Sequence, residues 1–110
     1  MKTVTCLLII AIAALSPAML AAAGNAQAGQ AVYVKTCKTC HGVSGEGNPA
    51  IAKALKVPIP NLAAKAVQSK SDDEMKKGIL SGTGKMQPVK AVSPAQALDV
   101  IAFVRTLAKK

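Results

Sequence analysis

The pentapeptide Cys37-Lys38-Thr39-Cys40-His41 constrains this chain more than any other feature. Two thiols on one turn of chain can add across the two vinyl groups of one porphyrin edge, and the imidazole that follows can then ligate the iron. A C-x-x-C-H run of this kind is the attachment site of a c-type haem. We therefore expect Cys37 and Cys40 to form thioethers to one covalently attached haem c, with His41 as the proximal iron ligand.

The sixth iron ligand must come from another residue type, because His41 is the only histidine in the chain. Met86 lies in the segment 82–88, whose glycines and proline can turn a side chain towards the iron. Met75 is the rival, but it lies in a predicted helix, where a methionine more often packs in a core. We expect Met86 to be the ligand, since His/Met ligation raises the haem potential and suits electron transfer.

Two other uses of the cysteine pair fit the sequence less well. A structural zinc site needs four Cys or His ligands, usually in two spaced pairs, and the chain has no second pair. A redox-active C-x-x-C belongs in a βαβ context, and the flanking segments lack the β-branched pattern of strands. Haem attachment is therefore the favoured use of the motif.

Residues 1–23 are predicted to be a cleaved secretory signal peptide. Lys2 supplies the positive start, an apolar run follows over 7–15, and the small residues up to Ala23 form an A-x-A-like cleavage site. Cleavage after Ala28 is an alternative. An uncleaved membrane anchor is the other alternative, but the apolar run is shorter than the ~20 residues that a spanning helix needs.

The remaining residues, 24–110, are expected to form one domain that is exported to the periplasm. Cys6 leaves with the signal peptide, so only Cys37 and Cys40 enter this oxidising compartment, where thioether formation gives them a chemical fate. The chain has one Phe, one Tyr and no Trp. A small core with so little aromatic bulk is marginal unless a large apolar cofactor fills it.

Capping signals and periodicity predict an all-α domain. A first helix over 30–37 would deliver the cysteines. The capping box S-D-D-E starts a helix over 71–80, which Gly82 ends. The sequence S-P-A-Q starts a last helix, whose apolar residues recur at helical spacing up to position 107. Glycines predict a loop over 42–49, and the prolines of 58–60 predict an extended segment.

Taken together, the chain resembles the class I single-haem bacterial cytochromes c. The segment 29–42, with its C-x-x-C-H-G, is similar to the family's first helix and haem site. The segment 78–88 is similar to its methionine loop, and 98–107 is similar to its C-terminal helix. The resemblance implies a small cytochrome c fold, with three to five helices wrapped around one haem.

The resemblance also implies contacts around that haem. Gly29 and Tyr33 would cross the last helix near Phe103, with Gly29 permitting a close approach. A proline carbonyl would accept the Nδ1 proton of His41, an outer contact that fixes the ring. Three prolines compete for that role, and the similarity of P-N-L at 60–62 to a family motif favours two of them. The candidates are Pro49, Pro58 and Pro60, with Pro58 or Pro60 preferred.

A haem protein with both axial positions filled is predicted to be a soluble periplasmic electron carrier and not an enzyme. One alternative is a haem c subunit of a larger membrane or periplasmic redox complex. Another is a gas-binding or sensing haem protein, which needs an open distal position that Met86 would close. A peroxidase-like enzyme would need distal acid and base residues, and no second histidine is present.

The charge of the chain predicts the kind of partner. Lys and Arg number 14 against 5 Asp and Glu, a net charge of +9. Lys38 lies inside the haem motif and Lys85 lies beside Met86, so both would surround the haem edge. Such charge steers encounter with acidic docking surfaces. We therefore expect donor and acceptor redox proteins with acidic surfaces as partners, and transient contact with membrane-bound redox complexes. The protein itself is expected to be a monomer. No aromatic platform indicates binding to nucleic acid.

Overall fold

The computed structural model describes residues 24–108. The predicted signal peptide, residues 1–23, lies outside the described residues. Six helical segments occur between residues 24 and 108: α1 (Ala26–Thr36), α2 (Lys38–His41), α3 (Pro49–Leu55), α4 (Lys65–Gln68), α5 (Asp72–Ser81) and α6 (Pro94–Thr106).

The all-α prediction is confirmed over the described part of the chain. Residues 24–108 contain no strand, only an isolated bridge between Thr83 and Met86. The number of helical segments exceeds the expected three to five because α2 and α4 are single turns of four residues. None of the helices between residues 24 and 108 is long and apolar enough to cross a membrane.

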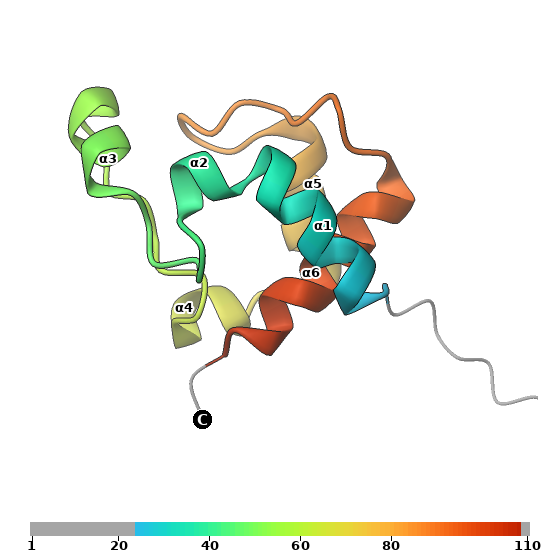
Figure 1. Ribbon diagram of the computed structural model, residues 1–110. Helices are drawn as coiled ribbons and strands as arrows, with labels where there is room; N and C mark the ends of the chain where they lie inside the picture. The colour runs from blue at the N-terminus through green and yellow to red at the C-terminus, as the bar shows by residue number, and fades with distance from the viewer. Residues whose placement is uncertain (1–23, 109–110) are drawn as a thin grey trace, which may run out of the picture.

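The packing of α1 across α6 forms the centre of the domain (Figure 1). A Cβ on Gly29 would overlap the Asp99 carbonyl of α6, so the two backbones approach as closely as glycine permits. The rings of Tyr33 and Phe103 lie 5.0 Å apart at 56°, the tilted arrangement that aromatic pairs favour. The predicted crossing of the first and last helices is therefore confirmed.

α1 begins four residues earlier than predicted because Asn25 caps it. The Asn25 side chain accepts a hydrogen bond from the Ala28 N–H at 3.0 Å, which satisfies one of the free donors at the helix start. The Asn25 N–H in turn donates to Asp99 Oδ1 at 2.8 Å. The start of α1 is thus tied to α6 as well as capped.

The buried core gathers where α1, α5 and α6 meet. Its fully packed members are Tyr33, Cys37, Val100, Phe103 and Val104. Partly buried side chains from α5 and the neighbouring loops, Met75 and Ile79 among them, pack against this cluster. Burial of apolar area of this kind contributes roughly 25 cal/mol per Å² to stability. Because Cys37 of the haem motif belongs to this cluster, the core lies directly beside the motif.

The predicted starts of α5 and α6 are both found. Ser71 Oγ accepts the Glu74 N–H at 3.1 Å at the start of α5. At the start of α6 the capping box is complete, with Ser93 and Gln96 bonded to each other in both directions. α5 ends at Gly82, whose φ of 77° is a conformation that favours glycine.

α3 and α4 were not predicted. Asn48 caps α3 and Pro49 occupies its first turn, a start signal that the glycines just before it obscure. α4 has no side-chain cap and so leaves no such signal. α3 stands apart from the crossing of α1 and α6, at the far side of the molecule (Figure 1). The segment 58–60 between α3 and α4 is non-helical, as predicted.

Candidate functional site

A cavity of about 390 Å³ opens between the haem motif, α5, α6 and the segment 82–88. Its size lies within the roughly 300–1,000 Å³ that is typical of ligand pockets. Most of its lining is apolar, from residues such as Leu62, Ile79 and Val100. Three of the four predicted site residues line it together: Cys37, His41 and Met86. The fourth, Cys40, is exposed and lies outside the lining.

The haem motif folds as a single turn set at an angle to α1. Cys37 ends α1 and precedes α2, with φ −115° and ψ −32°, and its N–H still donates to the Tyr33 carbonyl at 2.8 Å. The Cys37 side chain is buried against the core, and burial raises the pKa of its thiol. Cys37 therefore faces the cavity side of the motif while Cys40 faces solvent.

His41 presents an unpaired polar atom in the interior. Its Nδ1 is buried and has no hydrogen-bond partner between residues 24 and 108. Burial lowers the pKa of the imidazole, which favours the neutral form, the form that ligates metals. Of the three candidate prolines, only Pro60 lines the cavity. The predicted hydrogen bond from His41 Nδ1 to a proline carbonyl is therefore not found among the described residues.

The methionine loop, residues 82–88, is held at both ends. Thr83 and Met86 exchange two backbone hydrogen bonds, of 3.0 and 2.9 Å, and the Val89 N–H donates to the Ile79 carbonyl at 2.9 Å. A Cβ on Gly82 would lie 2.6 Å from the Met86 carbonyl, so a larger residue there would displace the loop. These contacts hold Met86 at the cavity.

Met75 also lines the cavity, from α5. It packs against the core cluster of Tyr33 and Phe103 as well, which agrees with its predicted packing role. Because the two methionines both reach the cavity, the assignment of Met86 as the ligand stays a prediction that needs a direct test.

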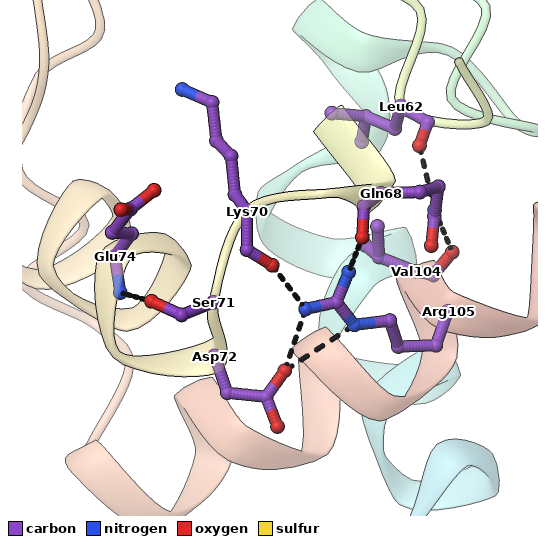
Figure 2. Close-up of polar contacts among 8 residues, drawn as sticks. All are labelled: Leu62, Gln68, Lys70, Ser71, Asp72, Glu74, Val104 and Arg105. Atoms are coloured by element: carbon purple, nitrogen blue, oxygen red, sulfur yellow. Dashed lines mark hydrogen bonds and ion pairs between the residues drawn. The ribbon is translucent and has the colours of Figure 1, made fainter. Parts of the chain in front are cut away.

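Two side chains, Gln68 of α4 and Arg105 of α6, join the wall of the cavity to α6 (Figure 2). Arg105 donates to the Gln68 carbonyl at 2.6 Å, to the Lys70 carbonyl at 2.7 Å and to Asp72 Oδ1 at 2.7 Å. Gln68 Nε2 donates to the carbonyls of Leu62 and Val104, at 2.8 and 2.9 Å.

The sequence singled out Arg105 only as part of the last helix, and Gln68 not at all. Both side chains bond to backbone carbonyls, which every residue carries, so no residue pattern marks these contacts in advance. Their effect is to fix the segment that carries Lys70 and Glu74, both of which line the cavity.

Tyr33 ties the haem motif to the core. Its hydroxyl donates to the Gly42 carbonyl at 2.6 Å, directly after His41. The residue is 1% exposed, and burial raises the pKa of Tyr33 to about 12. A buried hydroxyl with one strong acceptor fixes the end of α2 against α1.

The residues at the cavity fit a c-type haem. A buried imidazole and a thioether are the axial ligands of His/Met cytochromes, and both line one largely apolar cavity. His41 Nδ1 is a buried polar atom with no hydrogen-bond partner among residues 24–108, so no protein group competes for this atom. Cys37 is placed for a thioether, whereas Cys40 would have to reach the same cofactor from the outer side of α2.

Comparison with known proteins agrees with this fit. The family model described as Cytochrome c matches residues 26–108. A solved structure titled "KustC0563 c-type cytochrome" is 30% identical, with a TM-score of 0.63, over 74% of this chain and 98% of that one. Cytochrome cL from Hyphomicrobium denitrificans is 26% identical, with a TM-score of 0.60, over 81% of this chain.

The alignment with cytochrome cL covers 51% of that protein, so this chain corresponds to about half of its length. No curated protein matches this chain. The family match spans nearly all of the described residues and includes the haem motif, the methionine loop and the last helix. The chain belongs to the cytochrome c family.

Proposed function

We propose that this chain is a periplasmic electron carrier with one haem c, attached through Cys37 and Cys40 and ligated by His41 and Met86. The observation that carries the proposal is that Cys37, His41 and Met86 line one and the same cavity. Membership of the cytochrome c family supports the cofactor and the carrier role. The apolar lining supports a large, flat, hydrophobic ligand.

Each residue has a defined task in this proposal. Cys37 and Cys40 tether the cofactor so that it cannot dissociate. His41, kept neutral by burial, offers a ring nitrogen to the iron. Met86 would supply the second protein ligand of the iron, a soft and neutral thioether. The haem itself supplies a one-electron couple, and the apolar walls keep water away from it.

Closure of both axial positions favours a carrier over an enzyme or a gas sensor. A sensor needs an open position for its ligand, which the Met86 thioether would occupy. A peroxidase-like enzyme needs acid and base residues on the distal side, and His41 is the only histidine. An electron carrier requires neither an open iron position nor acid and base residues, because no substrate has to bind.

Charge supports the kind of partner. Lys38 and Lys85 are both exposed, and they flank the haem motif and Met86 respectively. With a net charge of +9 on the whole chain, we propose donor and acceptor proteins with acidic docking surfaces. Encounter of this kind is fast, weak and dependent on salt.

The sixth ligand is tested by carbon monoxide titration of the reduced, haem-loaded protein, with spectra and potentials recorded in parallel. Met86→Ala should leave the haem attached, lower the potential and open the iron to carbon monoxide. Met75→Leu is the matched control, since it nearly conserves volume in the core and should change none of these. Reversal of the two results would assign the ligand to α5.

A wild-type protein that binds carbon monoxide as readily as Met86→Ala does would show an open distal position. The gas-binding alternative would then replace the carrier.

A further inference from the structure

Lys85 makes a contact that a role in docking does not explain. Its Nζ donates a hydrogen bond to the Leu55 carbonyl at 3.1 Å, across 30 positions of sequence. Leu55 is the last residue of α3, and Lys85 directly precedes Met86. The bond therefore joins the methionine loop to the end of a helix that is distant in the chain.

The other end of the same segment is bonded to the haem motif. Asn48, which caps α3, donates from Nδ2 to the Thr39 carbonyl at 3.0 Å and from its N–H to the Cys40 carbonyl at 2.9 Å. The Gly47 N–H donates to the His41 carbonyl at 2.7 Å. The start of α3 is thus held by three residues of the motif.

Packing does little to hold α3 between these two ends. None of its residues is buried, Leu55 is 42% exposed, and the helix stands away from α1 and α6 (Figure 1). Hydrogen bonds at its two ends therefore supply its contacts with the haem motif and with the methionine loop. At the methionine loop that contact is the Lys85 ammonium.

We propose that residues 48–55 form a strap between the haem motif and the methionine loop, and that Lys85 is a positioning residue that closes the strap and keeps Met86 on the iron. The proposal rests on the proposed ligation by His41 and Met86. A bond from an ammonium to a carbonyl is stronger than one between neutral groups. An added ligand such as imidazole binds the iron only by displacing the Met86 thioether. Any contact that restrains the methionine loop therefore weakens the binding of the added ligand.

The test is a spectral titration of the oxidised, haem-loaded protein with imidazole, at high salt so that surface charge is screened. Lys85→Ala should tighten imidazole binding about twofold, the effect of one solvent-exposed hydrogen bond from a charged donor. Lys90→Ala is the matched control, because Lys90 is an exposed lysine four residues after Met86 and its loss changes the net charge equally. Lys90→Ala should leave the imidazole affinity unchanged. Lys85→Arg keeps a charged donor and should have the imidazole affinity of the wild-type protein.

A second readout does not use the iron. Amide hydrogen exchange at Thr83 and Met86 should be faster in Lys85→Ala than in Lys90→Ala, because the strap no longer restrains the loop. Equal exchange in the two variants, or equal imidazole affinity, would overturn the role of Lys85.

The strap itself is tested by a double-mutant cycle. Asn48→Ala removes the cap of α3 and its side-chain bond to Thr39 but leaves the backbone bonds to Cys40 and His41, so alone it should tighten imidazole binding less than Lys85→Ala does. Added to Lys85→Ala, it should contribute little more, because one open end already releases the strap. Additive effects would show that the two ends act separately and would overturn the strap.

Failure of the ligand assignment has a different signature. Imidazole would then bind the wild-type protein as tightly as it binds Met86→Ala. If Met86→Ala binds more tightly while Lys85→Ala matches Lys90→Ala, the ligand assignment stands and the strap is wrong.

Discussion

Replacement of Arg105 by leucine should destabilise the domain by about 2.5 kcal/mol. Arg105 donates to the carbonyls of Gln68 and Lys70 at 2.6 and 2.7 Å, and to Asp72 Oδ1 at 2.7 and 3.3 Å (Figure 2). Arg105→Leu keeps an apolar side chain at this position of α6 and removes every donor. It therefore isolates the hydrogen bonds from the packing.

The magnitude follows from the exposure of the partners. The Arg105 side chain is 31% exposed and that of Asp72 is 59% exposed, so solvent screens the ion pair to about 0.5 kcal/mol. Each carbonyl bond contributes roughly 1 kcal/mol, less than a fully buried bond from a charged donor. Since 1 kcal/mol shifts the midpoint of a domain of this size by about 4–8 °C, Tm should fall by about 10–20 °C.

Thermal unfolding of the haem-loaded protein, followed by far-UV circular dichroism, measures this loss. A covalently attached haem stays on the chain, so the transition does not depend on cofactor concentration. Asp72→Asn removes only the ion pair and should lower Tm by about 2–4 °C. Arg105→Lys keeps the charge without the planar fork and should fall between the two. Equal small shifts in Arg105→Leu and Asp72→Asn would refute the contribution of the carbonyl bonds.

Two further predictions concern pH and salt. Because burial raises the pKa of Tyr33 to about 12, its protonated form stabilises the fold fully below the ordinary pKa of 10.0 and this contribution is lost as the pH rises towards 12. Phenolate absorbance follows this one tyrosine, and titration at the ordinary pKa in the folded protein would contradict its burial. The second-order rate with an acidic redox partner should fall steeply with salt, and Lys38→Glu should slow it more than Lys90→Glu, in stopped-flow measurements. A rate independent of salt would remove the docking role of Lys38.

The main helices were predictable because their signals are local. Ser71 and Ser93 mark the starts of α5 and α6, Gly82 marks the end of α5, and the spacing of apolar residues marks the buried face of α6. α3 carries a local signal too, Asn48 followed by proline, but the glycines before it favoured a loop. α4 is one turn without a side-chain cap, and its position depends on tertiary contacts.

The candidate site was predictable to the extent that its chemistry depends on rare residues. A cysteine pair, a single histidine and a methionine in a glycine-bearing loop stand out in any sequence, and Cys37, His41 and Met86 do line one cavity. The outward position of Cys40 and the burial of His41 Nδ1 could not be predicted. They depend on how α2 is set against α1.

The contacts that support the site were not predictable because their acceptors are backbone carbonyls. Arg105, Gln68 and Lys85 each bond to carbonyls distant in sequence. Such acceptors occur at every residue, so only the folded chain decides which one a donor meets. The charge of Lys85 was visible in the sequence, but its contact with α3 was not.

The most direct test of the central claim is the intact mass of the denatured protein, produced with a periplasmic haem-attachment system. We expect the mass of the processed chain plus one haem, retained in acidic organic solvent because Cys37 and Cys40 hold the cofactor by thioethers. The doubly substituted Cys37→Ser/Cys40→Ser protein should lack that added mass. A wild-type protein with the mass of the polypeptide alone, or one that loses its haem on denaturation, would contradict the account.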